Sequence, residues 1–412
     1  MQEHTGAAAG ARRTFAALAY PNYRLWFFGQ MTSLFGTWMQ STAQGYLVYE
    51  LTRSEVYLGY VGFASGIATW VFTLYGGVIA DRIPRRRLLV ITQTFSMILA
   101  FALSVLVFTR VVAPWHIIIL AFGLGVVNAF DAPARQSFVL EMVDRPVLTN
   151  AIALNSTMFN TATAIGPAIG GLTYAAFGPG WCFAINGMSF LAVIAALLAM
   201  RLPAVKARVS RGSAIADIRE GLRAVRSDRR IFAIICLLGA LSLFANAFAT
   251  LMPAWAVQVL GGDALTNGFL TSARGLGSLI TALGIAAMAH KLRKGRAMSA
   301  AAIAFPVGIV LFSLTRSLPL SLLMLFCVGA ANILVVNLAN SLVQNLVDDS
   351  VRGRVMGIYT LSFFGFMPIG AILAGSVAAV VGVPVTVALG GLCFLVCALV
   401  VILLVPSLRR QE

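Results

Sequence analysis

Apolar stretches of roughly 20 residues recur along the whole chain, and short polar runs separate them. An α-helix of that length crosses the hydrocarbon core of a bilayer. The pattern predicts twelve transmembrane helices, near 25–48, 57–80, 88–109, 115–133, 150–177, 181–200, 231–258, 266–289, 297–315, 319–343, 354–381 and 384–405. Glycine and proline recur inside these stretches, which membrane helices tolerate. We therefore expect an all-α membrane protein.

The composition leads to the same fold class. Of the 412 residues, 59% are hydrophobic and 11% are charged, whereas soluble domains are about half apolar and about a quarter charged. A soluble fold of this length could not bury so much apolar surface. The net charge of +16 does not indicate nucleic-acid binding, because the basic residues lie in short runs between the apolar stretches. We expect membrane lipids as partners, and no nucleic acid.

Chemically reactive residues are scattered rather than clustered. The cysteines fall within apolar stretches and show neither metal-ligand spacing nor a disulfide framework. The histidines stand alone, and no ATP-binding P-loop is present. We therefore expect no enzymatic activity, no bound metal and no cofactor, and an ion gradient as the energy source for any transport.

The distribution of basic residues orients the chain. If both termini are cytoplasmic, 26 of the 30 lysines and arginines fall on the cytoplasmic side. Arg53, Arg110 and Arg316 fall outside, and Arg274 lies within a span. The opposite orientation would reverse the ratio. We expect a multi-pass protein of the bacterial inner membrane, monomeric, with both termini in the cytoplasm.

One long polar stretch divides the spans into two sets of six. Apolar residues recur at helical spacing within it, with arginines between them, which predicts an amphipathic helix lying on the anionic inner leaflet. We therefore predict a cytoplasmic tail at 1–22, a six-helix bundle at 23–200, a linker at 201–230, a second bundle at 231–406 and a tail at 407–412. No small-residue cleavage site follows Arg12 and Arg13, so we expect the first span to be retained.

The two sets of spans look duplicated. A shift of 204 residues superposes Asp144 on Asp348, Gly166 on Gly370 and Gly171 on Gly375, among other identities. The match covers the loop before the fifth and eleventh spans and continues into both spans. Two related halves are what a transporter that rocks around a midplane site requires.

The loop after the second span carries a charged motif. Gly77, Asp81, Arg82 and Arg85 form the pattern G-x-x-x-D-R-x-x-R, with Pro84 in the turn. Arg85 lies four residues after Asp81 and can reach back to it. An ion pair at this depth would be strong while dry and weak once water enters.

This pattern resembles the most characteristic motif of the major facilitator superfamily. The resemblance implies that Asp81 sits beside the N-terminus of the eleventh span, where the helix dipole favours an anion. It also implies that Asp81 pairs with Arg85 and with Asp131, the acid at the end of the fourth span. We predict a gating network of Gly77, Asp81, Arg82, Arg85 and Asp131. Pro84 departs from the family, which usually has glycine there.

The fifth span contains Gly166, Pro167, Gly170 and Gly171, which bend the helix and allow another helix to approach closely. Simple helix packing would account for them. The sequence also resembles the antiporter motif of the superfamily, found mainly in exporters. That resemblance places the motif between the halves, where the fifth span meets the eighth.

Longer segments resemble one branch of the superfamily. They are 22–26, 36–40, 131–138, 150–155 and 352–356. This is the enterobactin-exporter-like branch, also described as transmembrane secretion effectors, whose members export siderophores, drugs and other metabolites. Thr163 stands where the branch often has arginine, so a charge that would contribute to coupling there is absent.

Polar residues inside the spans are candidates for substrate binding or coupling. Arg274 lies about 12 Å into the eighth span, where an arginine is costly enough to suggest function. It could bind an anionic group, modulate a proton site or extend to the interface. Glu50 is the candidate proton carrier. Further candidates, each of which could instead bond two helices, are Gln40, Gln44, Asn155, Asn160, Asn246 and Asn337.

These features predict a secondary transporter that exports a small amphipathic metabolite, siderophore or drug by alternating access, with proton antiport. A lipid or lysophospholipid flippase and an importer of the same fold remain open. A flippase would show a lateral opening with basic residues at headgroup level, and a metabolite exporter an enclosed aromatic pocket.

Overall fold

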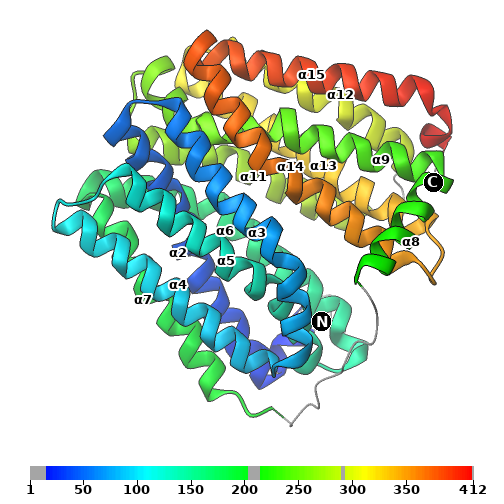
Figure 1. Ribbon diagram of the computed structural model, residues 1–412, viewed down its shortest axis with the longest axis horizontal. Helices are drawn as coiled ribbons and strands as arrows, with labels where there is room; N and C mark the ends of the chain where they lie inside the picture. The colour runs from blue at the N-terminus through cyan, green and yellow to red at the C-terminus, as the bar shows by residue number, and fades with distance from the viewer. Residues whose placement is uncertain (1–14, 203–213, 289–292, 411–412) are drawn as a thin grey trace, which may run out of the picture.

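The computed structural model describes residues 15–202, 214–288 and 293–410, and nearly all of them are helical (Figure 1). No strand occurs within these ranges. Arg12 and Arg13, the middle of the predicted linker and Lys291 lie outside the described residues. The predicted all-α fold class is confirmed.

The first six long helices match the first six predicted spans. They are α2 (Pro21–Thr52), α3 (Glu55–Arg82), α4 (Arg85–Phe108), α5 (Pro114–Phe138), α6 (Leu148–Phe177) and α7 (Pro179–Ala199). Short 3-10 turns accompany them at η1 (Ala16–Ala19), η2 (Val139–Glu141) and η3 (Arg145–Val147). We call α2–α7 the N bundle.

The second set of helices follows α8 (Ala214–Ser227). It consists of α9 (Arg229–Ala240) with its irregular continuation to Val259, then α11 (Ala264–Met288), α12 (Lys294–Ser313), α13 (Leu318–Leu346), α14 (Arg352–Val381), α15 (Val383–Leu404) and the turn η7 (Pro406–Arg410). We call α9–α15 the C bundle. Among the described helices, nine are long and apolar enough to cross a membrane, which is consistent with the twelve predicted spans.

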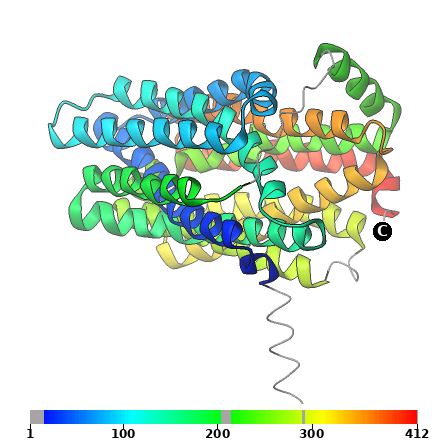
Figure 2. The same ribbon diagram turned by 90° about the horizontal axis from the view of Figure 1, so that it is seen from below.

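The two bundles lie side by side, and α8 lies outside both of them (Figures 1 and 2). α8 packs on the start of α14, where a Cβ added to Gly221 would lie 2.9 Å from the carbonyl oxygen of Arg354. Val225 is buried at the same contact, while Arg219, Arg223 and Arg226 are exposed. We call the end of the molecule that carries α8 the α8 end, and the opposite end the far end. The proposed domain boundaries stay predictions.

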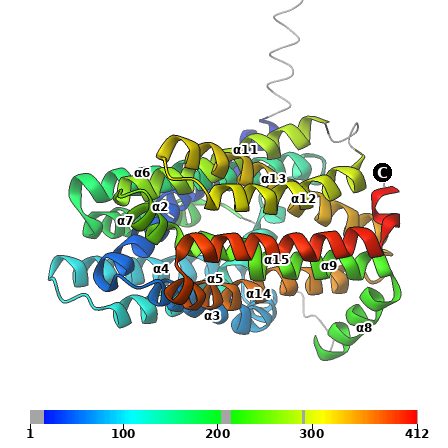
Figure 3. The ribbon, with the colours of Figure 1, turned by 90° about the horizontal axis from the view of Figure 1, so that it is seen from above.

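The bundles meet along two helix pairs, α3 with α14 and α6 with α11. Figure 3 shows α6 beside α11 in a view at right angles to Figure 1. Gly59 faces Gly375 in the first pair, and Gly171 faces Gly268 in the second; a Cβ on Gly375 or Gly171 would come within 3.1–3.2 Å of the opposite Cα. We call these two contacts the seams.

Both seams lie toward the far end of the molecule. Glycines on the same helices nearer the α8 end, Gly77, Gly284, Gly353 and Gly357, have no atom within 4 Å of an added Cβ. The helix pairs therefore separate toward the α8 end, as Figure 1 shows for α3 and α14.

The internal duplication is visible in the helix boundaries. α6 and α14 begin and end at positions offset by 204 residues, and α7 and α15 begin at the same offset. Gly178 and Gly382 link these pairs with φ of 86° and 85°, a left-handed conformation that glycine adopts at little cost. Gly171 and Gly375 are also related by this offset, so the repeat maps one seam onto the other.

The seventh span departs from the continuous helix expected from its apolar pattern. After α9, the chain forms the π-helical turn η4 (Leu241–Ala245), the 3-10 turn η5 (Asn246–Leu251), the short α10 (Met252–Ala254) and the π-helical turn η6 (Trp255–Val259). Pro253 removes one backbone donor within this stretch. Irregular backbone at membrane depth is tolerated where protein or a cavity surrounds it, and such turns often mark functional sites.

The seams should tolerate no added methyl group. In Gly275→Ala the new Cβ would lie 2.5 Å from the carbonyl oxygen of Thr163 and 2.7 Å from Cα of Ala164, both backbone atoms. Because two helices would have to move apart, we expect the protein to lose about 1–3 kcal/mol of stability. A lowered midpoint of thermal unfolding in detergent would measure this.

Gly284→Ala on the same α11 is the matched control. An added Cβ meets nothing within 4 Å there, and alanine is a better helix former than glycine by about 1 kcal/mol. This variant should unfold at or above the wild-type temperature. Equal loss of stability in both variants would show that the close approach at the seam is not the cause.

Candidate functional site

The residues of the predicted gating network lie at the α8 end of the N bundle. Gly77 is half-buried on α3, Arg82 is exposed at the end of α3, and Arg85 begins α4. Asp81 lies in the last turn of α3, and its side chain is not among those described. Its predicted pairing with Arg85 and with the dipole of α14 therefore stays a prediction.

The structure separates Arg85 from Asp131 and gives each a different partner. Arg85 forms an ion pair of 2.6 Å with Glu141, just after the end of α5. Asp131 is 5% exposed and accepts hydrogen bonds of 2.8 Å from Thr92 and from Gln93 of α4. Its other oxygen lies 3.5 Å from Arg135.

Sequence reasoning missed Glu141. The available signal was its position, because it lies on the same side of the membrane as Arg85 in the loop after the fourth span. Among the described residues, Arg85 with Glu141 and Asp131 with Arg135 thus form two ion pairs within the N bundle at this end. Nearby, Tyr20 donates a 2.8 Å hydrogen bond to Asp144, and this bond raises the pKa of the tyrosine.

The four antiporter-motif residues lie on α6 between α2 and α11. An added Cβ on Gly166 would meet Trp38, and one on Gly170 would meet the backbone of Met39, both on α2. Gly171 faces α11 instead. The motif therefore lets α6 approach one helix of its own bundle and one of the other.

Pro167 interrupts the hydrogen bonding of α6, and α11 supplies a bond near the bend. The backbone N–H of Ala168 donates to the hydroxyl of Ser272 at 2.8 Å. Ser272 and Gly275 face α6, whereas Gly277 and Ser278 face α13, where Ser278 donates to the carbonyl of Gly329 at 3.0 Å. The small residues of α11 thus serve two contacts.

Arg274 lies about 15 Å along α11 from Ala264, the first residue of the helix at the far end of the molecule. This depth is close to half the thickness of the hydrocarbon core. The guanidinium carbon of Arg274 is 5.8 Å from the ring centroid of Phe248, within the range of a cation–π contact. It forms no ion pair with a carboxylate in the part of the chain that the structure describes. The residue therefore presents a positive charge next to an aromatic ring.

The irregular seventh span supplies the ring. Phe248 lies in η5, two residues after Asn246, and Asn246 accepts a 2.8 Å hydrogen bond from Asn332 of α13. Phe248 packs near Phe312, which stacks on Trp255 with centroids 4.3 Å apart. This aromatic group fixes η5 and η6 against α12.

Two of the other five predicted polar candidates bond a neighbouring helix. Gln40 accepts from Asn186 at 2.7 Å, and Asn155 accepts from Tyr23 at 3.1 Å. Asn160 donates to the carbonyl of Ser156 in its own helix at 2.8 Å. The remaining two are Gln44, which is buried, and Asn337, which is half-buried. Their roles in substrate binding stay predictions.

Glu50, the candidate proton carrier, lies near the far end of α2. It is exposed and accepts a short hydrogen bond from the hydroxyl of Tyr174 on α6. The structure thus places Glu50 far along the molecule from the gating residues. Within the described residues, no cluster of three or more His, Cys, Asp or Glu could hold a metal ion.

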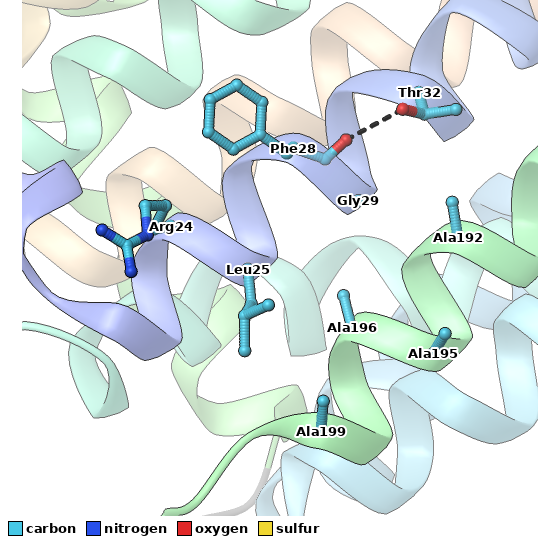
Figure 4. Close-up of a pocket in the computed structure, with 9 residues that line it drawn as sticks. All are labelled: Arg24, Leu25, Phe28, Gly29, Thr32, Ala192, Ala195, Ala196 and Ala199. Atoms are coloured by element: carbon cyan, nitrogen blue, oxygen red, sulfur yellow. Dashed lines mark hydrogen bonds between the residues drawn. The ribbon is translucent and has the colours of Figure 1, made fainter.

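A groove of about 620 Å³ runs between α2 and α7 (Figure 4). Arg24, Leu25 and Phe28 lie along one wall, and four alanines of α7 line the other. A second groove, of about 470 Å³, lies where α6, α11 and α13 meet, beside Ser272. Neither groove is lined by a residue predicted to bind substrate.

Comparison with known proteins gives a match over almost the whole chain. The profile of the transmembrane secretion effector family matches residues 12–412. The multidrug efflux pump Tap of Mycolicibacterium fortuitum is 28% identical over 395 residues, 93% of this chain and 96% of that protein. The staphyloferrin A transporter of Staphylococcus aureus is 25% identical, covering 89% and 92%. The enterobactin exporter EntS of Escherichia coli is 25% identical, covering 95% and 93%.

Solved structures share the fold at lower identity. The nucleoside transporter NupG superposes with a TM-score of 0.69 at 15% identity, covering 95% of this chain and 99% of that one. A POT family transporter in complex with 5-aminolevulinic acid superposes with a TM-score of 0.75 at 12% identity, covering 94% and 96%.

Proposed function

The chain belongs to the transmembrane secretion effector family of the major facilitator superfamily, and on that premise we propose that it exports a small amphipathic metabolite, siderophore or drug. The relatives named above are an efflux pump, a transporter and an exporter. The proposal places the chain in a bacterial inner membrane with its termini in the cytoplasm.

The observation that carries the proposal is the unequal contact between the bundles. They meet through glycines at the far end and separate toward the α8 end. The helix ends and turns at the α8 end carry Arg82, Arg86, Arg87 and Arg145, so the positive-inside rule favours a cytoplasmic location for this end. In that orientation the space between the bundles opens to the cytoplasm, where an exporter collects its substrate.

Arg274 and Phe248 are our proposed contact for the substrate. An unpaired guanidinium at mid-depth favours an anionic group, and the adjacent ring favours an apolar or aromatic body. The polar residues that already bond other helices, such as Gln40 and Asn246, would hold the helices in place. Export would be coupled to proton entry, with Glu50 as the proposed carrier, and the protein would act as a monomer.

Asp81→Asn should abolish export. The change keeps the shape of the side chain and removes the charge that the gating network requires. We expect efflux to fall at least about tenfold, in line with the loss of a charged partner worth 1.4 kcal/mol or more. The measurement is accumulation, in whole cells, of a compound that cells expressing the wild type extrude.

Asp349→Asn is the control for this change. Asp349 is an exposed carboxylate in the loop before α14 and pairs with Arg352 at the surface. The Asp349→Asn variant should export normally, because exposed ion pairs contribute little to stability. Normal export by correctly inserted Asp81→Asn protein would exclude the gating role.

Arg274→Ala should impair export of anionic compounds more than neutral ones. The anionic substrate loses its charge partner, whereas a neutral compound loses only packing. We expect a difference of about tenfold between the two classes, measured as efflux rates in the same cells. Arg274→Lys, which keeps the charge, should retain part of the selectivity. Equal loss for both classes in Arg274→Ala would indicate a structural role.

An imposed pH difference should drive transport by the purified protein. In proteoliposomes, substrate should move against its own gradient while protons move in the opposite direction. A protonophore should abolish that movement. Uphill transport that persists with the protonophore would exclude proton antiport without affecting the assignment as a transporter.

A further inference from the structure

Three side chains connect the two bundles at the far end. The amide nitrogen of Gln258, in η6 of the C bundle, donates a 2.8 Å hydrogen bond to the hydroxyl of Tyr49 on α2. The same nitrogen donates a short hydrogen bond to a carboxylate oxygen of Glu55 on α3. A primary amide carries two N–H donors, so one side chain supplies both bonds. We call these three residues the far-end bridge.

The acceptors of the bridge are buried and its donor lies at the rim. Tyr49 is 2% exposed and Glu55 is 9% exposed, whereas Gln258 is exposed. A carboxylate withdrawn from water needs donors to offset the lost hydration, and a hydrogen bond to a charged group is stronger than a neutral one. Gln258 therefore contributes to the state in which the bundles touch.

Glu55 occupies the point where the α3–α14 seam ends. It lies in the first turn of α3, where the helix dipole favours a carboxylate. Its backbone oxygen would lie 2.5 Å from a Cβ on Gly375, so α14 packs directly against this turn. The side chain of Glu55 meets η6 while its backbone meets α14, which fixes the start of α3 between two elements of the C bundle.

The irregular backbone of the seventh span places Gln258. The residue lies in the π-helical turn η6, and the buried Trp255 at the start of that turn stacks on Phe312 of α12. A π-helical turn changes the direction of side chains relative to a continuous α-helix. Glu50 belongs to a separate contact, because it pairs with Tyr174 inside the N bundle.

We propose that the far-end bridge is a latch that holds the far end closed, and that Gln258 must release Glu55 before the bundles can part there. The proposal requires only that the bundles move relative to each other, as the proposed function does. A transporter with this latch spends more of its time with the far end shut. Loss of the latch therefore shifts the population toward the state that is open at the far end.

The test is a distance measurement between spin labels in loops of the two bundles. Val111→Cys and Leu314→Cys place labels at exposed positions near the far ends of the N and C bundles. The background lacks the five native cysteines. With the wild-type bridge residues, we expect the distance between the two labels to show a single population, with the far end closed. Gln258→Glu replaces the amide donor that faces Glu55 with a second carboxylate, so a longer distance should appear.

A double substitution distinguishes loss of the bridge hydrogen bond from a general disturbance of the structure. Gln258→Glu combined with Glu55→Gln restores one amide donor and one carboxylate acceptor between the same two positions, with their roles exchanged. The distribution should return toward that of the wild type. Gln344→Glu serves as the control, since Gln344 bonds Asn340 within α13, well away from the far end.

We expect the ratio of open to closed molecules to rise about tenfold in Gln258→Glu and to fall back in the exchange variant. An unchanged distribution in Gln258→Glu would overturn the latch, and so would an exchange variant that stays as open as the single variant. The measurement uses neither substrate nor gradient. A negative result in this measurement would leave the export proposal unaffected. A negative result in the efflux assays would leave the proposed latch unaffected.

Discussion

The close approach of backbones at two seams is the constraint on which the rest of the structure depends. Gly171 faces Gly268, and Gly375 faces Gly59, with backbone atoms so close that a methyl group would need the helices to move apart. In lipid, helices gain little from hiding apolar side chains, because the surrounding chains are equally apolar. Close packing and hydrogen bonds must therefore hold the bundles together, and small residues make both possible.

The same constraint explains why the polar groups lie where they do. The bend at Pro167 brings the N–H of Ala168 to Ser272 of the other bundle. The π-helical and 3-10 turns of the seventh span bring Phe248 next to Arg274, and Gln258 to Glu55. Irregular backbone is costly in a membrane unless protein or a cavity satisfies its polar groups. Its concentration in one span, facing both the seam and the charged residue, is an argument for function rather than for defective packing.

The sequence predicts the helices well because the bilayer sets their length. Eleven of the twelve predicted spans each coincide with one described helix, and the 204-residue offset reappears in the boundaries of α6 and α14. The broken seventh span could not be predicted, because its residues are as apolar as those of a continuous helix. Glu141, which pairs with Arg85, was also missed, because it reaches Arg85 only through the fold and not through proximity along the chain. Gln40 and Asn155, expected as cavity candidates, show why a polar residue in a span is ambiguous, since each bonds another helix.

Alternating access needs contacts that can be exchanged without a large change in free energy. The far-end contacts suit that requirement, because they consist of glycine packing and a few hydrogen bonds, each worth about 1 kcal/mol or somewhat more when a charge takes part. At the α8 end, Arg85 and Asp131 already have partners within the N bundle, so neither is left as an unpaired charge while the bundles are apart. A state open at the far end would lose the seam contacts, so the bundles would have to meet at the α8 end instead. In a transporter that works by alternating access, two sets of contacts of similar strength at opposite ends of the bundles would let a modest gradient or a bound substrate decide which end is open.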